Sequence, residues 1–330
     1  MWGDGMCDAG GIRRGWGRRG VRSWGRMRGV IRLPLPIVLL SLPPLVLAGC
    51  AASTNTDALA SRSGRSTVSN SAALEQHASW HARRLAALQA EDGWLTLVGL
   101  DFLVDGTHTL GSGSEASFRY DNCDGDIVGA FEVRGDAVRF RRQGAGEWEP
   151  LQADDAGPPS VIRSGSVSCT LVRRNGRLAL RVRDNRSVVR TGFAGIDLFP
   201  YDPSLVLEAE VRTPAANETV AITNVTGFVE SQPVAARLVC VVGGESVELV
   251  ATAGSGGALF VVFGDGTNGR ETYGGGRFLE VTPPKDGRAT LDFNRAYNPP
   301  CSFTAFATCP LPPASNRLTG AVQAGERAPR

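Results

Sequence analysis

The feature that most limits the fold is an alternation of apolar and polar residues, which recurs in short segments from Trp94 to Phe293. Alternation with a period of two places apolar side chains on one face of an extended strand, and it cannot form the apolar stripe of a helix. It predicts strands over residues 94–104, 127–133, 137–141, 167–173, 178–183, 205–212, 236–242, 247–251, 259–263, 277–281 and 289–293.

Short turns that contain glycine separate several of these segments, at Gly135-Asp136, Asn175-Gly176 and Gly243-Gly244. Two-residue loops of this chemistry join neighbouring antiparallel strands in tight hairpins. No second long helical pattern intervenes, and parallel strands would need such crossovers. We therefore expect a mostly β fold, either an antiparallel β-barrel or a two-sheet sandwich.

One amphipathic helix is expected before the strands, because apolar and histidine side chains recur there at spacings of three and four: Leu74, His77, Ala78, His81, Leu85 and Leu88. Asp92-Gly93 ends it. After the strands, a Pro-rich segment over 298–313 is expected to lie as ordered coil against the domain or to hang free. The helix, strands and coil together predict a single domain over 73–330.

The first 49 residues predict a secretory signal peptide. Eight arginines precede an apolar run over 33–47, which at fifteen residues is shorter than the roughly twenty that span a bilayer. The run leads into Leu47-Ala48-Gly49-Cys50, which resembles the lipobox of bacterial lipoproteins, so we expect cleavage before Cys50 and a lipid on its sulfur. A signal starting at Met27 has ordinary length, which makes residues 1–26 a candidate mis-start.

The segment 50–72 has almost nothing to bury and predicts a flexible tether between the lipid and the domain. These features place the protein in the cell envelope, bound to a membrane through Cys50. Ala51 follows the lipid cysteine where an inner-membrane lipoprotein tends to have Asp, which favours the periplasmic face of the outer membrane in a diderm cell. Without residues 1–49 the chain has 27 basic and 31 acidic residues, which disfavours nucleic-acid binding.

Several long strings carry a resemblance to a known family: residues 93–100, 263–279, 291–301 and 307–310. They resemble the DUF1684 family of bacterial and archaeal proteins of unknown function, and the resemblance extends over roughly residues 80–326. It implies no activity. Cys123 and Cys169 lie outside these strings, so the resemblance implies no role for them.

Polar residues concentrate at two strand ends and their loops, in the strings just named. The candidate ligand-binding residues are Asp265, Thr267, Glu271, Tyr273, Arg277, Asp292, Asn294 and Asn298. Burying charges costs several kcal/mol per ion unless partners satisfy them. The cluster is therefore a paired structural network, a ligand or active site, or a solvated loop. In the structural interpretation, Arg277 pairs with Asp292 or Glu271.

Three functions fit this cluster. The first is a membrane-anchored module that binds a small polar ligand or an envelope protein through it. The second is a hydrolytic enzyme with a carboxylate as general base and Tyr273 and Arg277 stabilising charge. The third is a purely structural module. No Gly-x-Ser-x-Gly nucleophile motif occurs in the sequence.

Two cofactor interpretations arise from the same region. Gly264 to Gly269 reads GxGxxG, but a strand follows instead of the helix that would bind a dinucleotide phosphate, so this interpretation is discarded. Oxygen-bearing positions at Asp265, Thr267, Gly269 and Glu271 alternate and could hold Ca²⁺, but a solvated turn is the favoured interpretation. We predict no cofactor and no metal site.

Histidines and cysteines complete the candidates. His77 and His81 lie four apart on the helix and could share a metal, but no third ligand is near in sequence, so a packed helix face beside Trp80 is the simpler interpretation. Cys301 and Cys309 predict a disulfide that clips the Pro-rich coil, with a catalytic thiol as the alternative. Cys123, Cys169 and Cys240 leave at least one thiol unpaired.

Overall fold

A computed structural model describes residues 57–329. The predicted signal peptide, its start at Met27, and the lipidation site Cys50 all lie outside the described residues. Residues from 68 onward fall in one compact unit, whereas residues 57–67 fall in a second unit, of which only helical backbone is described. The expectation of a single domain over 73–330 stays a prediction.

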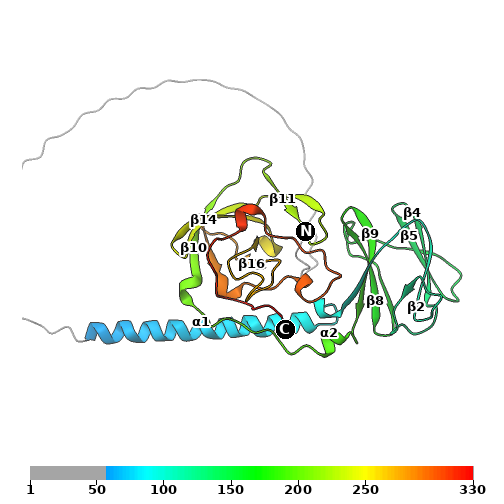
Figure 1. Ribbon diagram of the computed structural model, residues 1–330, viewed down its shortest axis with the longest axis horizontal. Coiled ribbons are helices and arrows are strands. Elements are labelled where there is room, and N and C mark those ends of the chain that lie inside the picture. Colours follow the sequence, from blue (N-terminus) through cyan, green and yellow to red (C-terminus); the bar gives the residue numbers. More distant parts are fainter. Residues whose placement is uncertain (1–56, 330) are drawn as a thin grey trace, which may run out of the picture. The chain divides into compact units, whose positions relative to one another are not determined.

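The N-terminal helix, α1 (Asp57–Gln89), confirms the expected helix and is longer than predicted (Figure 1). It begins inside the segment 50–72 that predicts a tether, and no proline interrupts the helical hydrogen bonds from Asp57 to Gln89. The helix ends at Gln89, shortly before the expected Asp92-Gly93, and Gly93 closes the turn that follows. Its N–H bonds to the Ala90 carbonyl, and a Cβ there would lie 2.3 Å from the carbonyl oxygen of Leu88.

Two sheets form a sandwich over residues 97–184. One has the strand order β1-β9-β8-β7 and the other β3-β2-β4-β5-β6, and Figure 1 shows them as two layers. Buried Phe131 and Phe140 of one sheet share a core with Leu171 and Leu180 of the other. The strands are β1 (Leu97–Phe102), β2 (Gly106–Gly111), β3 (Phe118–Arg119), β4 (Gly129–Arg134), β5 (Ala137–Arg142), β6 (Glu149–Pro150), β7 (Val161–Ser164), β8 (Val167–Arg174) and β9 (Arg177–Asp184).

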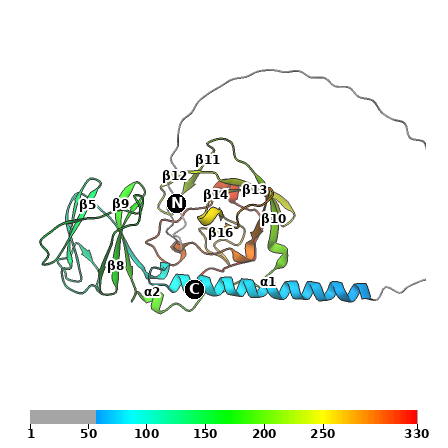
Figure 2. The ribbon, with the colours of Figure 1, turned by 180° about the vertical axis from the view of Figure 1, so that it is seen from behind.

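A six-stranded sheet follows, in the order β16-β15-β14-β13-β10-β17, and curves as a half-barrel around a second core (Figure 2). Phe263, Leu279 and Phe293 are buried in that core. The strands are β10 (Val206–Arg212), β13 (Ala236–Val242), β14 (Glu245–Ala253), β15 (Leu259–Phe263), β16 (Arg277–Val281) and β17 (Arg288–Asp292), and a separate hairpin pairs β11 (Thr219–Thr223) with β12 (Val229–Pro233). The mostly β, antiparallel fold class is confirmed; the described pairs are antiparallel except β2 with β3.

The predicted hairpin turns are confirmed at all three positions. Asn175-Gly176 and Gly243-Gly244 each have positive φ at both residues, 53° and 73° in the first and 59° and 88° in the second, as a type I′ turn requires. Gly135 has φ 57° and joins β4 to β5. These turns fix the registers of β8 on β9 and β13 on β14.

Short helical pieces connect the strands. They are α2 (Val188–Thr191), η1 (Trp94–Thr96), η2 (Pro203–Leu205), η3 (Ser255–Gly257), η4 (Phe293–Arg295), η5 (Pro300–Ser302) and η6 (Ala314–Asn316). The 3₁₀ helix η1 replaces the start of the strand predicted over 94–104. Its Thr96 side chain bonds to the Gly93 carbonyl, which favours a tight turn over extended backbone at that point.

The C-terminal segment after residue 298 is ordered coil packed on the half-barrel, the first of the two expected outcomes. Val322, Ala324 and Glu326 are each at most 1% exposed. Backbone bonds run from Gly266 to Gly320 and from Glu326 to Ala296. The coil therefore completes the core, although it carries no periodic pattern.

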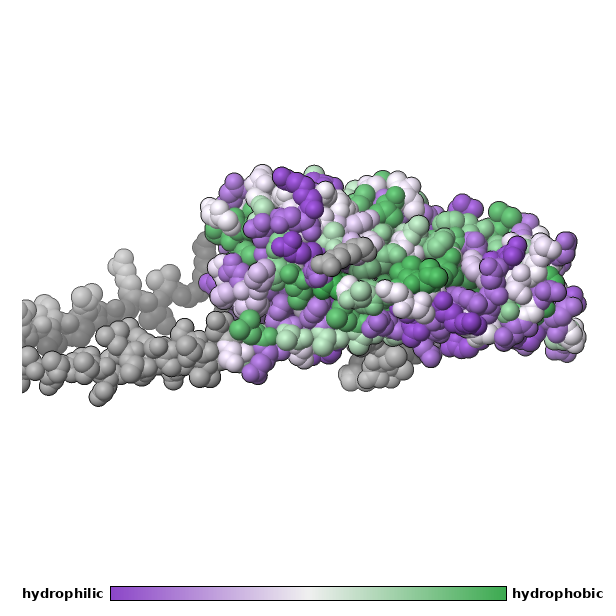
Figure 3. Space-filling model, turned by 60° about the horizontal axis from the view of Figure 1, so that its bottom comes forward, coloured by the Kyte–Doolittle hydropathy of each residue, from purple (hydrophilic) through white to green (hydrophobic). Residues whose placement is uncertain are grey.

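The surface carries apolar side chains at separate places, including Val104, Val188 and Val241. Figure 3 shows one face on which hydrophobic and hydrophilic residues lie side by side. Single exposed apolar residues are ordinary in folded proteins. No helix among residues 57–329 is both long enough and apolar enough to span a membrane.

Candidate functional site

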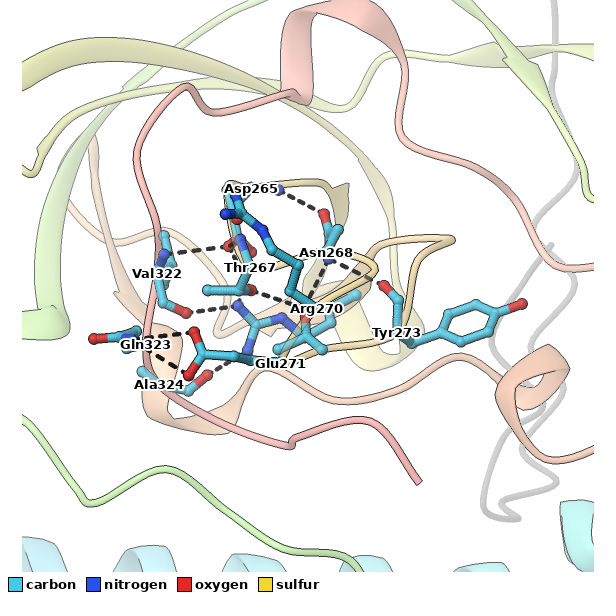
Figure 4. A network of polar contacts seen from close by, with 12 residues as sticks. Asp265, Thr267, Asn268, Arg270, Glu271, Tyr273, Val322, Gln323 and Ala324 are labelled. Carbon is cyan, nitrogen blue, oxygen red and sulfur yellow. Dashed lines mark hydrogen bonds and ion pairs between the residues drawn. The ribbon is translucent and has the colours of Figure 1, made fainter. Parts of the chain in front are cut away.

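The loop from β15 to β16 is folded by its own side chains (Figure 4). Asp265 Oδ1 accepts hydrogen bonds from the backbone N–H of Thr267 at 2.8 Å and from its hydroxyl at 2.6 Å. Asn268 Oδ1 accepts from the Asp265 N–H at 2.7 Å, and its amide group donates to Thr272 and to the Tyr273 carbonyl. Short polar side chains that bond to nearby backbone make such turns rigid.

Arg277 is the centre of the network and is fully buried, at 0% exposure. Its Nη2 donates to Asp265 Oδ2 at 2.8 Å and to the Val322 carbonyl at 2.8 Å, and its Nη1 donates to the Ala324 carbonyl. The guanidinium carbon also lies 5.3 Å from the centre of the Phe263 ring. Burial lowers the pKa of Arg277, and the Asp265 carboxylate opposes that shift. The pair ties the loop to the C-terminal segment.

The expected partners of Arg277 were wrong. Register explains the difference: Arg277 begins β16 opposite Phe263, the last residue of β15, so the nearest carboxylate is Asp265, two residues further along. Asp292 is instead placed 3.1 Å from Arg295 and caps the Asn294 N–H. Glu271 accepts hydrogen bonds from Gln323 at the surface.

Of the remaining candidate residues, some are buried and the others lie partly exposed at the edge of the cluster. Asn294 is buried and bonds in both directions with the Asp202 backbone, and buried Asn298 donates to the Arg327 carbonyl. Glu271 and Tyr273 are only partly buried. Figure 4 shows the Tyr273 ring pointing away from Thr267 and Glu271. The eight candidates therefore do not converge on one opening.

Both carboxylate oxygens of Asp265 already accept hydrogen bonds, one of them from the Arg277 cation. A Ca²⁺ ion there would have to displace these donors. This geometry therefore does not support a Ca²⁺ site at Asp265 and Glu271. Within residues 57–329, no group of three or more His, Cys, Asp or Glu side chains is arranged to hold a metal ion.

A second buried charge was not anticipated from the sequence. Glu326 is 0% exposed; its Oε1 accepts from Arg84 Nε at 3.0 Å and its Oε2 from the Asn298 N–H at 2.7 Å. Arg84 also donates to the Asn298 carbonyl at 2.8 Å and covers the Tyr297 ring. Glu326 lies in coil without a period, so no sequence signal marked it.

The helix face with the two histidines packs as the simpler interpretation predicts. His77 Nε2 lies 2.8 Å from the Asn294 carbonyl oxygen, and its ring stacks on Trp80 and tilts against Tyr201. His81 lies one turn later, and its Nε2 is buried without a hydrogen-bond partner among the described residues. The two rings face different surroundings.

Folding should weaken in mild acid because of His81. Burial lowers its pKa below the ordinary 6.5, with Glu326 opposing the shift and His77 and Arg84 adding to it. Since the unfolded chain then binds the proton more tightly, stability is complete above about pH 6.5 and declines as pH falls below it. Thermal unfolding of His81→Gln between pH 5 and 7.5 should show a flatter pH dependence. The matched variant His108→Gln should keep the wild-type slope, and equal slopes for all three proteins would contradict the assignment.

The structure has no bond between Cys301 and Cys309, the two cysteines expected to form a disulfide, and that disulfide stays a prediction. Cys301 and Cys309 are two free thiols, as are Cys123, Cys169 and Cys240. The Cys301 N–H donates to the Cys309 sulfur at 3.0 Å. Backbone bonds hold this coil without a clip: Phe303 N–H donates to the Pro300 carbonyl, and Val225 N–H donates to the Cys309 carbonyl.

A small hollow lies elsewhere on the half-barrel, lined mostly by apolar side chains that include Val250, Phe260 and Val262. Asn316 lies at its edge and uses its amide to bond the Val250 and Val262 carbonyls. None of the eight candidate residues lines this hollow. It therefore adds nothing to the polar cluster.

Comparisons with known proteins agree with the resemblance over part of its range. Residues 191–327 match the profile of DUF1684, a protein family of unknown function. No curated protein matches the chain. Among solved structures, the chain is similar to the solution NMR structure of an uncharacterized protein of Haloarcula marismortui, at 39% identity, covering 42% of this chain and 78% of that one, with a TM-score of 0.36. The expected resemblance before residue 191 stays a prediction.

Proposed function

Because the chain belongs to the DUF1684 family through residues 191–327, and no activity is attached to that family, we propose a function from the geometry of the site. The protein is a lipid-anchored module of the cell envelope, and its polar cluster is a structural lock that fastens the C-terminal segment to the half-barrel. The observation that carries the lock is the Arg277–Asp265 ion pair, with both side chains 0% exposed.

A ligand site at Arg277 would have to leave donors free for the ligand. Its Nη1 and Nη2 donate instead to Asp265, Val322 and Ala324, and the one donor without a partner, Nε, is buried. A general base at Asp265 would similarly have to give up the hydrogen bond from Arg277. These contacts support the structural function over the small-ligand and hydrolytic alternatives.

The anchoring part rests on the sequence. A basic segment, an apolar core too short to span a bilayer and Leu47-Ala48-Gly49-Cys50 support export and lipid attachment. A single acyl chain binds membranes only marginally, so stable anchoring needs more than one chain on Cys50. The absence of Asp at position 51 supports the periplasmic face of the outer membrane.

Cys50→Ala should abolish lipid attachment and leave the precursor uncut, because the modified sulfur is gone. The measurement is metabolic labelling with an alkyne-tagged fatty acid in a diderm host, together with the intact mass of the full chain. Cys240→Ala is the matched control and should keep the label. A wild-type protein that carries no label and still contains residues 1–49 would refute the anchoring; fractionation of the two membranes tests the outer-membrane location.

A further inference from the structure

Cys301 and Cys309 are brought together by the coil at the end of the half-barrel. Cys301 lies in η5, and its backbone N–H donates to the Cys309 sulfur at 3.0 Å. The two thiol groups are close enough to share a hydrogen bond. This contact makes them a pair, with seven residues between their positions in the chain.

The two cysteines differ in exposure. Cys309 is 3% exposed and packs with Phe260, Val262 and Phe278, whereas Cys301 is only partly buried at the edge of that cluster. A reagent from solvent therefore reaches Cys301 first. Reactive dithiols commonly combine one accessible sulfur with a second, shielded sulfur beside it.

Tyr273 adds a third group to the pair. Its hydroxyl donates to the Cys301 carbonyl oxygen at 3.4 Å and also interacts with the Cys301 thiol. Burial raises the pKa of Tyr273, so this hydroxyl keeps its proton and remains a donor. Tyr273 belonged to the predicted polar cluster, yet its contacts are with the cysteines rather than with Arg277.

The surroundings divide the thiols into a stronger and a weaker acid. Hydrogen bonding from Cys309, followed by that from Tyr273, lowers the pKa of Cys301 against the opposing effect of burial. Burial, followed by the hydrogen bond and charge of Cys301, raises the pKa of Cys309. The thiolate, which is the nucleophilic form, is thus favoured on the accessible sulfur.

We propose that Cys301 and Cys309 are a dithiol site for thiol–disulfide exchange, in which Cys301 attacks a disulfide substrate and Cys309 resolves the intermediate. This inference goes beyond the structural lock and the lipid anchor and does not depend on either. The substrate class is a disulfide presented at the surface of the half-barrel.

The exchange balances in two steps. The Cys301 thiolate attacks one sulfur of the substrate, the substrate S–S bond breaks, and the departing thiolate takes a proton from water, which leaves a mixed disulfide. Cys301 has then lost its negative charge, which removes one cause that held the proton on Cys309. The Cys309 thiol gives its proton to water, and the resulting thiolate attacks the Cys301 sulfur; the Cys301–substrate S–S bond breaks, and the second substrate thiolate leaves and takes up that proton. The protein is oxidised by two electrons to a Cys301–Cys309 disulfide, and the substrate disulfide is reduced to two thiols.

The same chain supplies controls. Cys123, Cys169 and Cys240 are buried, and burial raises the pKa of each thiol. Cys123 and Cys169 also interact with each other, yet both are buried. Cys123 and Cys169 are therefore an internal control for the Cys301–Cys309 pair: their thiols are close together, but neither sulfur is accessible from solvent.

The first test is alkylation of the reduced, native full chain by iodoacetamide from pH 5 to 9, followed by peptide mass spectrometry. Among the five cysteines of the described residues, Cys301 should react about tenfold faster at pH 7 than Cys123, Cys169, Cys240 and Cys309. Tyr273→Phe and Cys309→Ala, which each remove a donor to the Cys301 sulfur, should each move the Cys301 profile to higher pH, which a merely structural role would not do. An unshifted profile in both variants, or equal rates for all five thiols, would overturn the proposal.

The second test adds oxidised glutathione to the same reduced protein. Wild type should form the Cys301–Cys309 disulfide, Cys309→Ser should stop at a glutathione adduct on Cys301, and Cys301→Ser should gain no adduct on Cys309. Modification of Cys309 in Cys301→Ser at the wild-type rate would refute the assigned order. So would a native disulfide that dithiothreitol cannot reduce, because it would be a permanent clip.

Discussion

Asp265→Asn should lower the free energy of unfolding by about 3–5 kcal/mol, the usual cost of leaving one member of a buried ion pair without its partner. Asparagine keeps the shape of the side chain and can still cap Thr267 through its oxygen. Its NH₂ group, however, would face the Arg277 guanidinium in place of the Oδ2 that now accepts at 2.8 Å. Arg277 would remain a fully buried cation with two carbonyl partners, and its direct counter-charge would be lost; only the Glu326 carboxylate, which does not bond to it, would still oppose its charge.

Chemical denaturation of the full chain measures this loss. Glu210→Gln is the matched control, since it makes the same change in an exposed pair with Arg212, and exposed pairs contribute little. Arg277→Lys should also destabilise, because a single ammonium cannot reach Asp265, Val322 and Ala324 in the same geometry. If Asp265→Asn were as stable as wild type but had lost binding of a polar small molecule, the cluster would be a ligand site instead of a lock.

Strands could be predicted from the sequence where the alternation of apolar and polar residues and the turn residues determine their positions. Asn175-Gly176 and Gly243-Gly244 have the positive φ values that their turn chemistry requires, and each joins strands that sequence alternation had placed. The hairpin of β11 and β12 could not be found in this way. Its strands have one buried apolar residue, Ile222, so hardly any alternation marks a buried face.

The sequence could bring Asp265 and Arg277 into one region, but it could not predict that they pair. Composition brings Asp265 and Arg277 into one region, whereas the pairing depends on the register of β15 against β16. Three carboxylates lay within plausible reach of Arg277 in the sequence, and only the register distinguishes them. Spacing likewise could not reveal the backbone bonds that hold the coil around Cys301 and Cys309.

Glu326 is the clearest case of a residue hidden from sequence patterns. Coil has no period, so a buried carboxylate in it looks like any solvated glutamate. Its burial depends on Arg84, 242 positions away along the chain. Gly325 helps to place it: φ is 75°, and a Cβ would lie 2.3 Å from the Ala296 carbonyl oxygen.

Glu326→Gln is therefore expected to be the second severe substitution, with a loss of about 3 kcal/mol in the free energy of unfolding. Glutamine keeps one oxygen, so its NH₂ must face either Arg84 Nε or the Asn298 N–H, both of which are donors. Arg84 holds α1 to the C-terminal segment. In Glu326→Gln, amide hydrogen exchange should therefore accelerate more in the last turns of α1 than in β8 and β9. Glu271→Gln makes the same change at the surface, in the β15–β16 loop where Glu271 contacts Gln323 of the C-terminal segment, and should leave both measurements unchanged. Equal exchange in α1 for wild type and Glu326→Gln would mean that packing of His77 and Trp80, rather than the buried carboxylate, holds the helix.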